Sequence, residues 1–195
     1  MGISVRTVTT PELRDAVYRF RYEIYVREMG RSQHCADHDR QQVVDPLDAT
    51  GIVLAAVDDG TAQVVGTART NLLKHGRLEF YEHLYGLTAN PNFDEGSTAI
   101  TTRLMVAASH RGRNVTLRLA TALYDLGRLE QIAHDYIDCN DPVRSIFERL
   151  GYRWLAHIDH PEYGRVNLMG LDIDDVERLR AVKSPFLGRR TNHNG

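Results

Sequence analysis

The stretch VAASHRGRNVTLRLATALY, residues 106–124, decides the fold. It leaves an apolar run, passes through Arg-Gly-Arg-Asn and at once begins a segment with helical apolar spacing. A helix start presents unpaired N–H groups and a positive dipole end, and Gly112 allows a ligand to approach the backbone closely. Arg111 and Arg113 add fork-shaped donors. The stretch therefore predicts an anion-binding turn between a strand and a helix, or an ordinary turn with two solvated arginines.

Composition restricts the class of protein. The chain has 195 residues, 42% hydrophobic and 26% charged, with a net charge of -2. This charge argues against nucleic acid as the main partner. Cys35 and Cys139 do not make a disulfide framework, and no secretory signal or long apolar run is visible. We expect a cytoplasmic protein without a membrane span, with one domain over residues 1–183 and a flexible tail over 184–195.

The order of predicted elements indicates the architecture. Strands are expected at 3–8, twice within 51–70, at 99–107 and 134–138, and twice within 152–173. Helices are expected at 11–29, after Arg113 and after Asn140, which we predict to cap its helix, while 31–50 and 74–98 are read as loop and insertion. The order β-α-β-β-β-α-β-α-β-β is typical of an α/β (α+β) mixed sheet with helices on its faces.

The second half resembles the GNAT-type acyltransferases, through RLMVAASHRGRNVT, DYIDCN and RSIFERLGYR. The resemblance implies a GNAT fold with about seven strands, splayed between the strands at 99–107 and 134–138. It implies no permanently bound cofactor and an acyl thioester of coenzyme A or of acyl carrier protein as co-substrate. The backbone of Val106 would bind pantetheine, and Val106 N–H would polarise the thioester carbonyl. The other donor-binding residues would be Arg111, Gly112, Arg113, Asn114, Val115, Thr116 and Asn140.

Two departures from the GNAT pattern bear on the donor. Asn114 and Thr116 stand where the family has small residues, which suits the single phosphate of a carrier-protein arm at least as well as a pyrophosphate. Phe147 stands in place of the usual tyrosine that would protonate the departing thiolate. A thiol with an ordinary pKa near ~8.5 can leave with help from solvent.

The first half, with YRFRYEIYVREMG, VVDPLD, VVGTART and ITTRLMV, resembles the acyl-homoserine lactone synthases and the N-acyl amino acid synthases. The resemblance implies that Arg21, Asp45, Asp48 and Arg103 are catalytic. Arg69 and Glu79 are expected to bind the acceptor. A structural ion-pair network that fixes the first helix to the sheet is the alternative. Since Ile100 replaces the glutamate of the lactone synthases, the general base stays open among Asp45, Glu79 and Asp138.

Three further features of the sequence bear on its chemistry. His34, Cys35, Asp37 and His38 could ligate a metal but have no matching partners elsewhere, so no metal site is expected. Cys139 is expected to be a buried structural thiol and not a nucleophile. A group of arginines could dock an acidic acyl carrier protein or form a solvated face: Arg111, Arg113, Arg118, Arg144 and Arg149.

These patterns predict an N-acyltransferase that moves an acyl group from a carrier-protein or coenzyme A thioester to the amine of an amino acid or related small amine. An acetyl-coenzyme A dependent N-acetyltransferase and a non-catalytic module that binds acyl thioesters are the alternatives.

Overall fold

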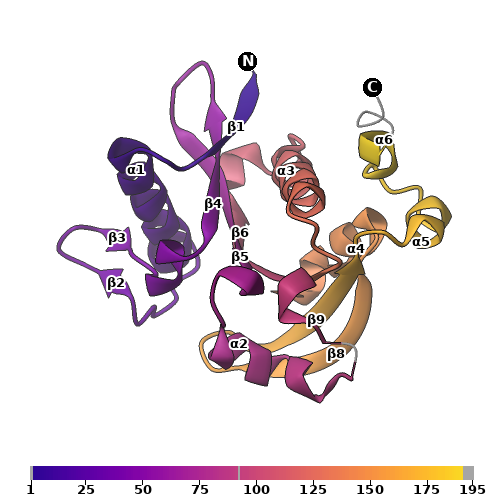
Figure 1. Ribbon diagram of the computed structural model, residues 1–195. Helices are drawn as coiled ribbons and strands as arrows, with labels where there is room; N and C mark the ends of the chain where they lie inside the picture. The colour runs from indigo at the N-terminus through magenta and orange to yellow at the C-terminus, as the bar shows by residue number, and fades with distance from the viewer. Residues whose placement is uncertain (1, 92, 191–195) are drawn as a thin grey trace. The chain divides into compact units, whose positions relative to one another are not determined.

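A mixed seven-stranded sheet, in the order β1-β4-β5-β6-β7-β9-β8, dominates the structure, a computed structural model that describes residues 2–91 and 93–190 (Figure 1). The strands are β1 (Ile3–Thr7), β4 (Ile52–Asp58), β5 (Val64–Leu72), β6 (Thr98–Val106), β7 (His134–Cys139), β8 (Arg153–His160) and β9 (Gly164–Asp172), and a separate pair is formed by β2 (Ala36–Asp37) and β3 (Gln42–Val43). The α-helices are α1 (Pro11–Tyr22), α2 (Glu79–Leu84), α3 (Val115–Leu129), α4 (Asp141–Leu150), α5 (Val176–Ala181) and α6 (Leu187–Arg190). The predicted mixed sheet flanked by helices is confirmed.

The chain divides into two compact units. The first contains residues 1–70 and 102–122, and the second contains residues 71–101 and 123–195. Among the described residues, none of the helices combines the length and apolarity that crossing a bilayer requires.

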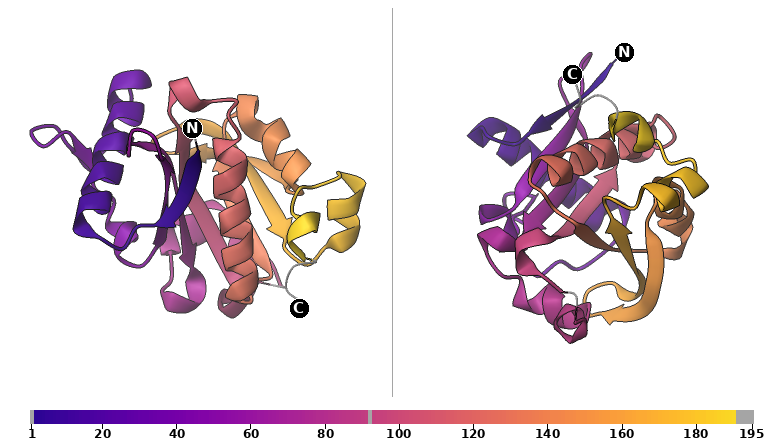
Figure 2. Two further views of the ribbon diagram at one scale, coloured as in Figure 1. Left: turned by 90° about the horizontal axis from the view of Figure 1, so that it is seen from above. Right: turned by 45° about the vertical axis from the view of Figure 1, so that its right-hand side comes forward.

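In the first unit, helices lie on opposite faces of β4 and β5 (Figure 2). Val17 of α1 packs against Val53 and Ala55 on one face. On the other face, a Cβ added to Gly66 would lie 3.0 Å from Val115 Cγ1 of α3. The antiparallel register, which pairs Ala56 with Gly66, explains this alternation because successive residues point to opposite faces.

Helix α1 begins where the sequence predicts. Thr10 Oγ1 accepts a hydrogen bond from Leu13 N (3.3 Å), and Pro11 is the first helical residue. After Tyr22 the helix continues as a π-helix over Glu23–Glu28, and Gly30 follows with φ +62°. π-Helical turns are rare in proteins overall, and those that occur frequently lie at functional sites.

In the second unit, β7 joins two neighbours. It pairs in parallel with β6 from Thr98↔His134 to Thr101↔Ile137, and antiparallel with β9. The carboxyl group of Asp135 is fully inside this unit, where it accepts hydrogen bonds from Tyr152 Oη (2.5 Å) and Thr101 Oγ1 (2.8 Å). Burial raises the pKa of Asp135 to about 7 although both hydrogen bonds act to lower it.

Several sequence predictions of secondary structure were wrong. The segment 31–50, predicted as a loop, contains the β2–β3 hairpin and a 3₁₀ turn at Pro46–Ala49. The segment 74–98 contains α2, and α5 was missed. All of these elements have six residues or fewer, too few for a periodic apolar pattern to show.

Residues 184–190, the described part of the segment predicted to be a flexible tail, make contacts within the second unit. Ser184 Oγ donates to Leu150 O (2.5 Å), and the Phe186 ring stacks on Tyr124 with centroids 4.3 Å apart. The apolar side chain of Phe186 is buried and holds this segment in place. The polar residues around it in the sequence gave no indication of this contact. Residues 191–195 lie outside the described residues.

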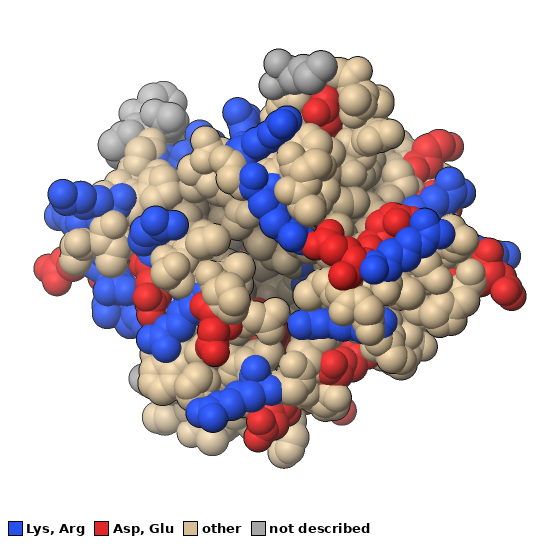
Figure 3. All heavy atoms as spheres, turned by 180° about the vertical axis from the view of Figure 1, so that it is seen from behind, with Lys and Arg blue, Asp and Glu red and all other residues tan. Residues whose placement is uncertain are grey.

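Charges of both signs are interspersed on the face drawn in Figure 3. Exposed arginines often have acidic partners one helical turn away, as in Arg144–Glu148 (2.8 Å) and Arg19–Asp15 (2.7 Å). Pairs of this kind contribute little to stability, since water screens both charges.

Candidate active site

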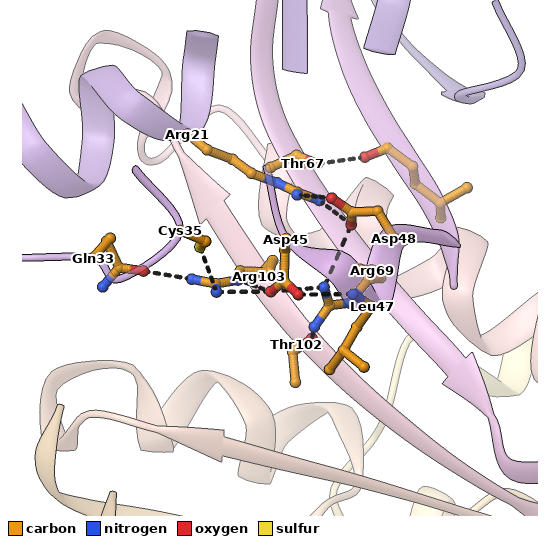
Figure 4. A network of polar contacts seen from close by, with 11 residues as sticks. Arg21, Gln33, Cys35, Asp45, Leu47, Asp48, Thr67, Arg69, Thr102 and Arg103 are labelled. Atoms are coloured by element: carbon orange, nitrogen blue, oxygen red, sulfur yellow. Dashed lines mark hydrogen bonds and ion pairs between the residues drawn. The ribbon is translucent and has the colours of Figure 1, made fainter. Parts of the chain in front are cut away.

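Five of the charged residues singled out from the sequence meet in one buried cluster of the first unit (Figure 4). Arg21 comes from α1, Arg69 from β5 and Arg103 from β6. Asp45 and Asp48 come from the 3₁₀ turn at Pro46–Ala49, which Asp45 caps by accepting a hydrogen bond from Leu47 N (3.0 Å). The prolyl residue at the first position of this turn also favours its start.

Each carboxylate of the cluster is shared by two arginines. Arg21 holds Asp48 with two hydrogen bonds, of 2.6 and 3.1 Å. Arg69 Nη1 lies 2.8 Å from Asp45 and 3.4 Å from Asp48. Arg103 donates from Nε (2.9 Å) and Nη2 (2.7 Å) to Asp45 Oδ2. Paired guanidinium donors of this kind fix both the distance and the plane of a carboxylate.

Residues that the sequence did not single out complete the cluster. Gln33 Oε1 accepts from Arg103 Nη1 (2.7 Å), and Thr102 Oγ1 accepts from Arg69 Nη2 (2.9 Å). The Tyr25 ring lies below the Arg103 guanidinium, 5.1 Å from ring centroid to Cζ. Gln33 lies 70 residues from Arg103 in the chain, so no spacing rule could have found it.

Arg103 has an unusual backbone. Its φ is +56°, in the left-handed region that non-glycine residues rarely adopt. A single left-handed residue inside a strand is typical of a bulge, which redirects a side chain and is frequent beside active sites.

The cluster has a surplus of positive charge and almost no exposure. Three guanidinium groups face two carboxylates, and every one of these side chains is at most 7% exposed. Within the described residues, Arg21 Nε and Arg69 Nε are buried donors without an acceptor. Because an unbalanced buried charge is costly, the cluster favours an additional anion.

The electrostatics make Asp45 a poor proton acceptor. Burial alone would raise its pKa, but Arg69 and Arg103 outweigh burial and hold the pKa of Asp45 well below its ordinary value. Asp45 is therefore an ionised partner of the arginines and a weak candidate for the general base.

At the end of β6, one side of the backbone faces away from β5. Ala107 N donates to Val65 O (2.9 Å), so the N–H and C=O groups of Val106 point to the strand edge opposite β5. Gly112 (φ +82°) and Asn114 (φ +61°) then turn the chain into α3. The first N–H groups of α3 have no helical acceptor, as at any helix start. These amides and Val106 are the donor-binding groups that the sequence predicts.

Arg111 is already engaged in this turn. Its Nε donates to Val106 O (3.2 Å), and its Nη2 pairs with Glu28 at the end of the π-helix. Arg111 and Arg113 are both exposed. Glu28 could not be identified from the sequence as a partner of Arg111, because the two residues lie 83 positions apart.

Three predicted residues belong to the second unit. Glu79 is exposed as the first residue of α2. Asn140 takes the N-cap position of α4 but its side chain makes no capping hydrogen bond, which corrects the prediction that it caps the helix. Asp138 accepts a hydrogen bond from Tyr85 Oη (2.7 Å).

Two alternatives for other chemistry are weakened. Burial raises the pKa of the Cys139 thiol to about 12, so it is not a ready nucleophile. In the part of the chain that the structure describes, no group of three metal-ligating side chains gathers around His34 or elsewhere.

Comparison of the sequence with models of known protein families gives a match over most of the chain. A model of the family described as "N-acyl amino acid synthase FeeM" matches residues 16–172. A search of curated proteins found no match.

Solved structures show the same fold at low sequence identity. FeeM, an N-acyl amino acid synthase from uncultured soil microbes, is 14% identical, with a TM-score of 0.68 over 89% of this chain and 92% of its own. TofI, solved with an inhibitor and MTA, is 14% identical, with a TM-score of 0.72 over 96% and 99%. BjaI, a CoA-dependent acyl-homoserine lactone synthase solved with SAM and isopentyl-CoA, is 18% identical, with a TM-score of 0.71 over 94% and 91%.

Proposed function

We propose that the acyl donor of this chain, which belongs to the N-acyl amino acid synthase FeeM family, is a carrier-protein thioester and that the acceptor is an amino acid. The chain is an acyltransferase that acts on an amine. Membership of a family of synthases favours an enzyme over the non-catalytic binding module.

The surplus positive charge of the buried cluster is the observation that carries the acceptor assignment. An amino acid brings one carboxylate, which would balance the three guanidinium groups against Asp45, Asp48 and itself. Arg21 and Arg69 have no exposed side-chain surface, so they support the two aspartates and do not touch the substrate directly. Arg103, at 4% exposure, is the proposed contact for the acceptor carboxylate.

The donor would bind along the side of Val106 that faces away from β5, where it would compete with Arg111 for Val106 O. An extended pantetheine chain carries amide groups that can pair with a strand edge. Val106 N–H would then stabilise the oxyanion that forms on the thioester carbonyl. The amides of residues 112–116 would bind the phosphate at the start of α3.

The reaction forms a C–N bond and breaks a C–S bond. The acceptor amine must lose a proton, and Asp45 is a poor acceptor for that proton because Arg69 and Arg103 hold it ionised. Phe147 offers no proton to the sulfur, so the thiolate leaves with help from solvent.

The carrier-protein donor is favoured over coenzyme A by the chemistry of the turn. Asn114 and Thr116 replace smaller residues where a pyrophosphate would need the closest approach, and a carrier arm has one phosphate. Arg113 is exposed beside this turn and is available to an acidic carrier protein.

The test measures amide formation by mass spectrometry with acyl carrier protein and coenzyme A thioesters of matched chain length. Each donor is combined with an amino acid and with the corresponding amino acid amide, which lacks the carboxylate. We expect the carrier-protein donor and the free amino acid to react fastest. Equal rates with the acid and the amide would refute the acceptor assignment, and faster reaction with coenzyme A thioesters would refute the donor assignment.

A further inference from the structure

A chain of three polar side chains lies beside the proposed donor turn and has no part in the acyl transfer described above. Ser109 Oγ lies 2.9 Å from His110 Nδ1, and His110 Nε2 lies 3.3 Å from Asp58 Oδ2. Ser109 and His110 belong to the 3₁₀ turn at Ala108–His110 that follows β6, and Asp58 ends β4. All three residues lie in the first unit.

The hairpin fixes the orientation of Asp58. Its Oδ1 accepts hydrogen bonds from Gly60 N (2.8 Å) and Thr61 N (3.2 Å), which leaves Oδ2 directed at His110. These contacts, with the backbone hydrogen bond from Gly60 as the largest and that from His110 next, lower the pKa of Asp58. The carboxylate is therefore an acceptor only.

The orientation of Asp58 sets the tautomer of His110. Because Asp58 can only accept, the neutral imidazole carries its proton on Nε2 and presents the lone pair of Nδ1 to the Ser109 hydroxyl. His110 and Asp58 are mostly buried, with side chains 14% and 6% exposed, whereas Ser109 is exposed. A hydroxyl, a base within reach of it and a third group that orients the base are the arrangement of an activated nucleophile.

We propose that Ser109, His110 and Asp58 form a nucleophilic site that hydrolyses activated acyl esters, including the acyl thioester when no acceptor amine is bound. Ser109 Oγ bonds to the acyl carbon while His110 Nδ1 takes the hydroxyl proton. The C–S bond then breaks, and the thiolate takes that proton. Water next attacks the Ser109 ester, with His110 accepting its proton and returning it to Ser109 Oγ, and a carboxylic acid is released.

The thioester as the substrate of this site rests on the proposed function, whereas the nucleophilic character of Ser109 does not. The site needs no metal and no redox partner, since the only co-reactant is water. It would give the enzyme a means to discharge a bound donor in the absence of acceptor.

The experiment uses the full chain, a fluorophosphonate probe, p-nitrophenyl butyrate and an acyl carrier protein thioester without acceptor. We expect the probe to label Ser109, as located by peptide mass mapping, with loss of fluoride. Ser109→Ala should lower hydrolysis of both substrates by at least about tenfold and leave amide synthesis unchanged. Ser145→Ala, which removes an exposed hydroxyl from α4, is the matched control and should change neither.

A second variant distinguishes a serine that His110 and Asp58 activate from a serine that is merely exposed. Asp58→Asn keeps the acceptor for Gly60 N, but its amide would donate to His110 Nε2 and leave the proton on Nδ1, so hydrolysis should fall as with Ser109→Ala. Hydrolysis that persists in Ser109→Ala, or a probe that labels Ser109 and Ser145 equally, would overturn the inference. Hydrolysis that depends on Ser109 in a protein that makes no amide would support this inference while refuting the proposed function.

Discussion

Asp45→Asn removes one negative charge from the buried cluster and keeps the shape of the side chain. The wild-type carboxylate accepts hydrogen bonds from Arg103 at 2.7 and 2.9 Å and lies 2.8 Å from Arg69. The variant would leave Asp48 as the one carboxylate of the cluster against three guanidinium groups, so the buried surplus of positive charge would double. Breaking a buried pair by removing one partner costs about 3–5 kcal/mol. For a chain of this length, that corresponds to a fall in Tm of about 6–20 °C.

The pH dependence of this loss follows from the pKa of Asp45. The folded-state pKa lies below the ordinary value near ~3.9, so the carboxylate contributes its full stabilisation above pH ~4 and loses it as the pH falls towards the folded pKa. The stability difference between wild type and Asp45→Asn should therefore be constant from pH 5 to 7 and shrink below pH ~4.

Urea unfolding followed by circular dichroism at pH 7 and pH 3 measures this difference. Asp39→Asn, which removes an exposed carboxylate from the same loop, is the matched control and should change stability by less than about 0.5 kcal/mol. If Asp45→Asn were as stable as Asp39→Asn at pH 7, the cluster would not be held by paired buried charges, and the argument for an additional anion would fail.

Three more outcomes are expected. Arg103→Lys should lower kcat/KM for amide formation by at least about tenfold, because an ammonium group lacks the planar fork of donors that holds Asp45 and Gln33, and steady-state kinetics with varied acceptor would show it. Glu28→Gln should lower the KM for the donor by up to about fivefold by releasing Arg111 from Val106 O, and an unchanged KM would mean that this contact does not compete with the donor. For Asp135, the folded pKa of about 7 exceeds the unfolded value, so wild-type stability should fall between pH ~4 and ~7, and urea titrations of Asp135→Asn should lack that component.

Much of the fold followed from local patterns. Long strands and helices such as β5, β6 and α3 have enough residues to show their periodicity, and Thr10 with Pro11 marks the start of α1. The short elements β2, β3, α2 and α5 could not be predicted in this way. They are held by side-chain contacts such as Asp37 Oδ1 with Arg40 N (2.9 Å) in the β2–β3 turn, which resemble those of any surface turn until coordinates are known.

The members of the buried charged cluster could be selected from the sequence, but their contacts could not. A family resemblance selected Arg21, Asp45, Asp48, Arg69 and Arg103, and the structure places all five in one cluster. Their pairing could not be predicted, since Arg21 meets Asp48 across 27 residues and Arg103 meets Asp45 across 58. The burial of each arginine depends on packing, which the sequence alone does not specify.

The sharing of each carboxylate between two arginines limits how the family can change over time. A substitution at Asp45 would leave Arg103 without a carboxylate partner, and one at Asp48 would do the same to Arg21, while Arg69 would keep one of its two partners. Proteins that descend from this chain should therefore keep or replace these residues together, although the residues come from four separate segments of the sequence.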